Sequence, residues 1–136
     1  MLKIVHYLNQ FFGQIGGEDM SDTPPLLKRE PVGPGLAFVQ QLQGLATISA
    51  TVICGDNYMA QNQEKAIEAL LAFIRAESPD LFIAGPAFNA GRYGPACGAI
   101  CAAVSEELGI PVITGMYPEN PGAELYRQNV LVVKTG

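Results

Sequence analysis

The segment Ile83-Ala-Gly-Pro-Ala-Phe-Asn-Ala-Gly-Arg-Tyr-Gly-Pro-Ala-Cys97 runs from an apolar stretch into a glycine-rich polar turn and then into small residues. This order is typical of a strand, a tight loop and a helix that packs closely on a sheet. Three other apolar stretches end in similar polar turns, which begin at Asn9, Cys54 and Gly115. Because ligands bind at the carboxyl ends of the strands in open parallel sheets, we expect the four turns to form one site.

Five short stretches are mostly apolar and do not alternate cleanly between apolar and polar residues, which predicts the buried strands of a parallel sheet. They are Ile4–Leu8, Ile48–Ile53, Leu81–Ala84, Val112–Thr114 and Val130–Val133. We therefore expect an α/β fold with three layers (αβα) and a five-stranded, mostly parallel sheet, Rossmann-like or flavodoxin-like.

The connections between these strands contain helix signals. A helical repeat over residues 66–74 ends at Ser78-Pro79, where proline disfavours further helix. A second helix is predicted over about Pro95–Leu108, with Gly109 as its C-terminal cap. A shorter one is expected after Asn120. The connection over residues 10–35 is rich in glycine and proline and shows no period before Leu36, so we expect a lid or an interface loop.

Length and composition limit the class of protein. A chain of 136 residues with 49% apolar and 15% charged residues is long enough for one core. We expect a single α/β domain over residues 1–136, the amino-terminal part of a longer subunit, because no helix follows the last strand. The net charge of −5 and the scattered basic residues argue against binding to nucleic acid. Without a signal peptide or a spanning segment, a cytoplasmic location is expected.

The turn Asn89-Ala-Gly-Arg-Tyr-Gly94 contains the strongest candidate site residues. Gly91 and Gly94 let the backbone approach a ligand, and Asn89 adds an amide. The planar guanidinium of Arg92 suits a carboxylate or a phosphate. The alternative is a surface arginine in a tight turn.

Two further turns add candidates of opposite charge. Asp56 follows a strand in Cys54-Gly-Asp-Asn-Tyr58, although Asp56 or Asn57 could simply cap a helix, with Cys54 in the core. Tyr117 and Glu119 could hold an ammonium group, although a proline-rich exposed turn is the alternative. With Arg92, this set matches a zwitterion such as an amino acid.

Other motifs argue against several classes of site. The fingerprints Gly-x-Gly-x-x-Gly and Gly-x-x-x-x-Gly-Lys-Ser/Thr are absent, which weakens nucleotide binding. Three cysteines and one histidine lack metal-ligand spacing, so no metal is expected. Cys97 and Cys101 share a helical face and His6 lies within a strand, so all three are interpreted as core residues. No catalytic residue is assigned, because neither a Ser-His-Asp set nor a close pair of carboxylates is evident in the sequence.

Several long blocks resemble one family, the selenoprotein B subunit of the glycine, sarcosine and betaine reductases. The blocks are Val5-His-Tyr-Leu-Asn-Gln-Phe-Phe-Gly-Gln-Ile-Gly-Gly-Glu18, Val32-Gly-Pro-Gly35, Thr51-Val-Ile-Cys-Gly-Asp-Asn-Tyr58, Ala84-Gly-Pro-Ala-Phe-Asn-Ala-Gly-Arg-Tyr-Gly94 and Gly115-Met-Tyr117. The resemblance extends over nearly the whole chain.

The resemblance implies reductive cleavage of the C–N bond of glycine or an N-methylated relative. In that family a selenocysteine attacks the substrate, whose amine is activated by a pyruvoyl group on a partner subunit of component B. The product then passes to selenoprotein component A. The selenocysteine belongs to a later segment that this sequence does not contain, so none of the three cysteines takes that role. The resemblance therefore implies an oxidoreductase component that has no cofactor of its own in this region and is inactive alone.

Two alternatives of other classes are open. The glycine-rich loops could dock against partner subunits through a patch of Phe11, Phe12, Ile15 and Tyr93 and never touch substrate. The second alternative is a flavin-binding α/β domain. The absence of a phosphate loop rich in serine and threonine after the first strand argues against it.

Overall fold

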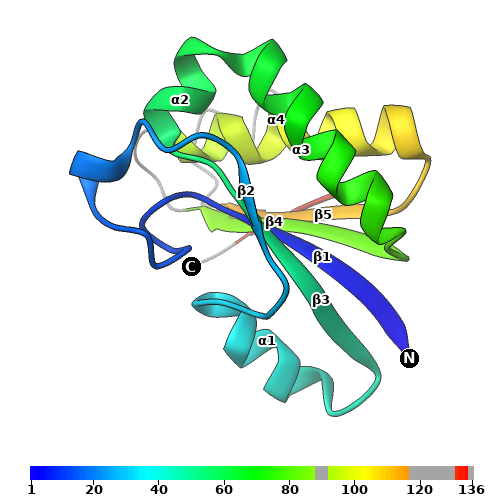
Figure 1. The fold of residues 1–136 in the computed structure, drawn as a ribbon. Helices are drawn as coiled ribbons and strands as arrows, with labels where there is room; N and C mark the ends of the chain where they lie inside the picture. Colours follow the sequence, from blue (N-terminus) through cyan, green and yellow to red (C-terminus); the bar gives the residue numbers. More distant parts are fainter. Residues whose placement is uncertain (88–91, 117–130, 135–136) are drawn as a thin grey trace.

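A twisted mixed sheet forms the centre of the computed structural model, which describes residues 1–87, 92–116 and 131–134 (Figure 1). Within these residues the sheet has six strands in the order β2-β3-β1-β4-β5-β6. Their bounds are β1 Leu2–Leu8, β2 Leu26–Lys28, β3 Ala46–Ile53, β4 Leu81–Ala87, β5 Val112–Met116 and β6 Leu131–Lys134. Strand β2 is antiparallel to β3, and the other neighbours are parallel.

The five predicted strands are confirmed, and the short edge strand β2 joins them. The parallel strands alone have the order 2-1-3-4-5, which is that of flavodoxin-like doubly wound sheets. After β1 the chain forms β3 on one side of β1, and it then crosses to the other side of β1 to form β4. The switch point therefore lies between β1 and β4, where a ligand crevice is expected at the carboxyl ends of the strands.

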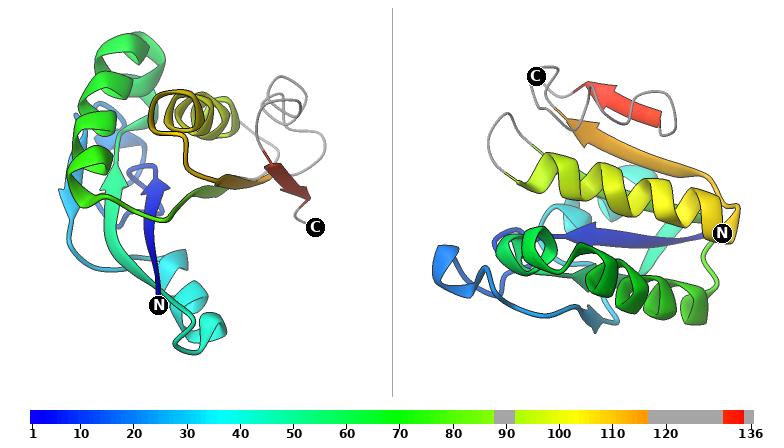
Figure 2. Two further views of the ribbon diagram at one scale, coloured as in Figure 1. Left: turned by 90° about the vertical axis from the view of Figure 1, so that its right-hand side faces the viewer. Right: turned by 90° about the horizontal axis from the view of Figure 1, so that it is seen from above.

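Helices cover both faces of the sheet and complete the three predicted layers (Figure 2). Helix α1 (Pro34–Leu42) lies on one face, and α2 (Asp56–Gln61), α3 (Gln63–Glu77) and α4 (Tyr93–Leu108) lie on the other. Helix α1 occupies a stretch for which the sequence predicted no helix. The helix expected after Asn120 lies outside the described residues.

Helix α4 begins two residues earlier than predicted, and aromatic packing explains the difference. Tyr93 is 5% exposed and stacks on Phe12, with ring centroids 5.6 Å apart, and also packs on Tyr7. This burial fixes Tyr93 in the first helical turn. Gly94 is therefore a helical residue rather than part of the preceding turn.

Two apolar clusters fill the layers between helices and sheet. On the α2–α4 face, Val5 and Phe82 of the sheet pack with Leu70 of α3 and Ile100 of α4. On the α1 face, Ile4 and Ile48 pack against half-buried side chains that include Phe38. The continuous hydrophobicity of the strands follows from this burial on both sides.

The long connection after β1 is tied to the start of α2 by backbone hydrogen bonds. The N–H of Gly55 donates to the carbonyl of Thr23 at 2.8 Å, and those of Asn57 and Tyr58 donate to Ser21 at 2.8 and 3.0 Å. This connection also includes a 3-10 helix, η1 (Glu18–Met20). It is therefore fixed to the carboxyl edge of the sheet.

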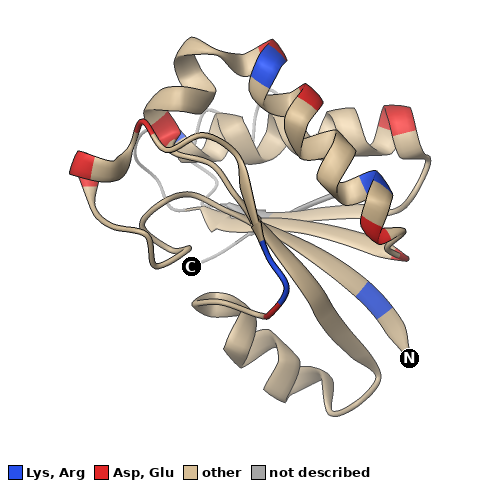
Figure 3. Ribbon diagram, viewed as in Figure 1, with Lys and Arg blue, Asp and Glu red and all other residues tan. Residues whose placement is uncertain are grey.

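Charged residues are dispersed over the described part of the molecule. Figure 3 shows basic positions on β1, at the end of β2 and on α3, without a common stripe. None of the helices in the described ranges is long and apolar enough to cross a bilayer.

Candidate functional site

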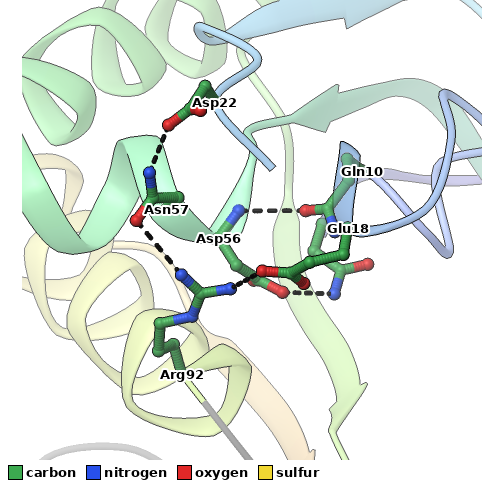
Figure 4. A network of polar contacts seen from close by, with 7 residues as sticks. Gln10, Glu18, Asp22, Asp56, Asn57 and Arg92 are labelled. Atoms are coloured by element: carbon green, nitrogen blue, oxygen red, sulfur yellow. Dashed lines mark hydrogen bonds and ion pairs between the residues drawn. The ribbon is translucent and has the colours of Figure 1, made fainter. Parts of the chain in front are cut away.

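Polar side chains from three strand ends meet at the carboxyl edge of the sheet (Figure 4). Asn9 and Gln10 follow β1, Asp56 follows β3, and Arg92 lies between β4 and α4. The loop that carries Glu18 reaches the same place. The network therefore lies at the topological switch point, where the fold places ligands.

Asp56 is the buried acid of this network, with 9% of its surface exposed. Its Oδ2 accepts a hydrogen bond from Asn9 Nδ2 at 3.0 Å, and its backbone N–H donates to Gln10 Oε1 at 2.9 Å. Its Oδ1 is buried and finds no hydrogen-bond partner among the described residues. Asp56 therefore presents one unused acceptor.

The surroundings of Asp56 act on its pKa in opposite directions. Burial raises the pKa most, and the nearby negative charge of Glu18 adds to the rise. The hydrogen bond from Asn9 and the positive charge of Arg92 lower it. The net shift is upward, so the carboxylate lacks full compensation for its lost hydration.

Arg92 links the loop that carries Glu18 to Asn57 in the first turn of α2. Its Nη1 donates to Oδ1 of Asn57 at 3.2 Å, and its Nη2 pairs with Oε1 of Glu18 at 2.8 Å. Asn57 in turn donates from its amide to Asp22. The Arg92 side chain is 40% exposed, so it lies partly at the surface and is held there by these two contacts.

A small cavity of about 280 Å³ lies beside Arg92 between α2 and α4. Its lining is mostly apolar and comprises Met59, Ala60, Gln63, Arg92, Pro95 and Ala96. A guanidinium at an apolar cavity suits a small anion that carries methyl or methylene groups.

The structure brings together two of the predicted site residues, Asp56 and Arg92. Gly94 lies in the first turn of α4, where backbone N–H groups have no partner within the helix. The capping interpretation of Asp56 is wrong, because Gly55 is the N-cap of α2 and no side chain caps that helix. Asn89, Gly91, Tyr117 and Glu119 lie outside the described residues.

Five residues of the network were not among the predicted site residues. They are Asn9, Gln10, Glu18, Asp22 and Asn57. Asn9 and Gln10 directly follow an apolar strand, and this position alone would have justified naming them as candidates. Glu18 lies in a connection with no secondary-structure period and 74 positions from Arg92, so no local pattern indicated their contact.

Only part of the proposed docking patch lies at the surface. Phe11 is 60% exposed and Ile15 is half-buried, but Tyr93 is buried beneath Phe12. Tyr93 therefore cannot contact a partner, and its place in the patch is corrected.

His6 is confirmed as a hydrogen-bonded core residue. Its ring is fully buried, and Nε2 lies 2.6 Å from the carbonyl of Gly85, which fixes the hydrogen on that nitrogen because a carbonyl only accepts. Burial lowers the pKa of His6 to about 4.

The three cysteines are free and buried. Burial raises the pKa of Cys54 and of Cys101 to about 12, and it also raises the pKa of Cys97. They pack as small apolar residues, as predicted for Cys97 and Cys101. The described residues contain no cluster of three or more histidine, cysteine, aspartate or glutamate side chains that could bind a metal.

Comparison with known proteins decides the family. The sequence profile of the family described as "Glycine/sarcosine/betaine reductase selenoprotein B" matches residues 1–136. The chain belongs to this family. The predicted resemblance is thereby confirmed.

Three curated members illustrate the similarity across the family. The chain is 58% identical over 133 residues to the glycine reductase complex component B subunit gamma of Carboxydothermus hydrogenoformans. It is 51% identical over 135 residues to a sarcosine reductase complex component B subunit beta, and 43% identical over 136 residues to a betaine reductase complex component B subunit beta, both from Peptoclostridium acidaminophilum.

These alignments cover 98 to 100% of the chain but only 31% of each relative. The chain therefore spans about a third of the length of the curated relatives that it matches. No solved structure matches the chain.

Proposed function

We propose that this chain supplies substrate-holding groups to component B of a glycine, sarcosine or betaine reductase, an enzyme complex that cleaves the C–N bond reductively. Family membership supports this assignment, as do the names of the relatives, which are components of such complexes. The three named substrates share a carboxylate and a positively charged nitrogen one carbon away.

The observation that carries the proposal is the meeting of Asp56 and Arg92 at the switch point. The Arg92 guanidinium offers N–H donors to a substrate carboxylate, and the buried Oδ1 of Asp56 offers an acceptor or a negative charge to the amine end. An ammonium group would also stabilise the buried negative charge of Asp56. The hydrogen bond from Asn9 and the charge of Arg92 stabilise it only in part.

The remaining predicted residues complete this assignment. Asn89 and the backbone of Gly91 and Gly94 would hold the carboxylate with Arg92, while Tyr117 and Glu119 would shape the amine end. The selenocysteine nucleophile and the pyruvoyl group are proposed to lie outside this chain, on the same subunit and on a partner subunit of component B. Selenoprotein component A would receive the product.

Substitution of Arg92 and Asp56 in the assembled complex tests the proposal. Arg92→Ala and Asp56→Asn should each raise the Michaelis constant by about one to two orders of magnitude, the loss expected for a charged hydrogen bond. Arg75→Ala is the matched control, because Arg75 is an exposed arginine in the last turn of α3, which leads to the amino end of β4 and not to the carboxyl edge of the sheet. An unchanged Michaelis constant and turnover in both site variants would remove this region from substrate binding.

A docking role is the second candidate, and the exposure of Phe11 favours it. Phe11 adjoins a cavity of about 320 Å³ whose other lining residues are Gln14, Ile15, Gly16 and Gly17. The occupant would be another subunit of the reductase complex, held by an apolar contact at this loop. Phe11→Ser should then weaken assembly in a pull-down measurement, while the Michaelis constant of the assembled complex stays unchanged.

A further inference from the structure

Glu18 already places a carboxylate on Arg92. Its Oε1 lies 2.8 Å from Arg92 Nη2, and the side chains are 75% and 40% exposed. The carboxylate of Glu18 is chemically the same group as the carboxylate of a small amino acid, and it uses a donor that such a ligand needs. A ligand and Glu18 therefore compete for one guanidinium.

The backbone beneath Glu18 is held in place, so its side chain can leave without opening the loop. The loop is anchored by Ser21, whose carbonyl accepts from Asn57 and Tyr58. Apart from Arg92, the Glu18 side chain has no other hydrogen-bond or ion-pair partner in the described part of the chain. Rotation of an exposed side chain is fast and costs little.

The charges around Arg92 also favour an exchange of carboxylates. The negative charge of Glu18 raises the pKa of Asp56, whereas the positive charge of Arg92 lowers it. If a zwitterion replaced Glu18, a carboxylate would still face Arg92, and the ligand's positive nitrogen would reach Asp56. The exchange keeps the ion pair of Arg92 and adds one for Asp56.

We infer that Glu18 is an internal, displaceable substitute for the carboxylate of the substrate, occupying Arg92 when the site is free and swinging out when an amino acid binds. This inference rests on the proposed function. It assigns the ligand class, a small zwitterion with an exposed carboxylate, and it makes Glu18 a competitor for Arg92 rather than a catalytic residue.

Removal of the competing charge tests the inference. In the assembled complex, Glu18→Gln should lower the Michaelis constant for the accepted substrate among glycine, sarcosine and betaine by roughly two- to fivefold, the factor expected for an exposed ion pair that must first be broken. The turnover number should not change, because the substitution removes only a ground-state competitor. Glu18→Asp retains the charge on a shorter side chain and should give a smaller decrease.

Asp19→Asn is the matched control, since Asp19 lies on the same 3-10 helix and forms no ion pair with any described residue. It should leave both constants unchanged. A purely structural role of Glu18 predicts the opposite sign, because loss of its ion pair would loosen the site and raise the Michaelis constant.

The outcomes separate the two proposals. If Glu18→Gln leaves the Michaelis constant unchanged or raises it while Arg92→Ala still impairs binding, the substitute role of Glu18 is wrong and the binding site stands. If neither variant affects binding, the proposed function of this region fails, and the inference fails with it.

Discussion

Asn9 and Asp56 are 47 positions apart in the sequence, yet Asn9 Nδ2 donates to Asp56 Oδ2 at 3.0 Å in the interior. The parallel pairing of β1 and β3 brings them together, because each residue follows the end of one of these neighbouring strands. Asn9 also uses its Oδ1 to accept the backbone N–H of Phe12 at 2.9 Å. One amide therefore fixes both the buried acid and the start of the long connection.

Substitution of Asn9 by alanine should destabilise the protein and perturb Asp56. The buried Oδ2 of Asp56 and the partly buried N–H of Phe12 would each lose a hydrogen bond, so the free energy of unfolding should fall by about 1–3 kcal/mol. The pKa of Asp56 should rise further, because the hydrogen bond that lowers it is gone. Urea unfolding measures the first effect. Gln40→Ala on the exposed face of α1 is the control, and an equal loss in both variants would contradict the role of Asn9.

Stability should also depend on pH through His6. Its pKa is about 4 in the folded protein and ordinary, near 6.5, in the unfolded chain. Between these values the unfolded state binds more protons, so stability is full above pH 6.5 and falls as the pH drops toward 4, by up to about 3 kcal/mol. The raised pKa of Asp56 contributes with the opposite sign, since its protonation favours the folded state.

Comparison with His6→Gln isolates the histidine. The amide can still donate to the carbonyl of Gly85 but does not titrate. Urea unfolding at pH 7 and pH 4.5 should show a larger loss of stability for the wild type than for this variant. Equal losses would mean that His6 is not the group that destabilises the fold in acid.

Gly55 is expected to tolerate no side chain. A Cβ atom there would overlap the backbone of Ser21 and Thr23, which cannot move without breaking the anchor of the long connection. Gly55→Ala should lower the free energy of unfolding by about 1–3 kcal/mol, as for other overpacked positions. Gly17→Ala is the control, because its Cβ would lie at an ordinary 3.5 Å from Asp19 Oδ1. Thermal unfolding that ranks the two variants equally would contradict this account.

The sequence was sufficient to predict the strands and the proximity of Asp56 and Arg92, for physical reasons that particular residues illustrate. Stretches such as Ile48–Ile53 are apolar on both faces because helices cover both faces. Asp56 and Arg92 follow strand ends, and a parallel sheet brings such ends together. In contrast, the edge strand β2 has only three half-buried residues and carries no pattern.

Contacts made by tertiary packing could not be predicted in the same way. The early start of α4 depends on Tyr93 stacking against Phe12, and the occupation of Arg92 depends on Glu18 from a connection without a period. Neither partner is near in sequence, so local propensity says nothing about the pair. These are the contacts through which the long connection shapes the site.

The native cysteines should be protected from alkylation. Cys54, Cys97 and Cys101 are fully buried, and burial raises the pKa of each thiol, so little thiolate is present near neutral pH. Iodoacetamide at pH 8 should therefore modify none of them within the time that labels all three in urea, as read by mass spectrometry of peptides. The unfolded sample controls for reagent and time. Rapid modification of Cys54 alone would contradict its core position and would indicate that the end of β3, next to Asp56, opens to solvent.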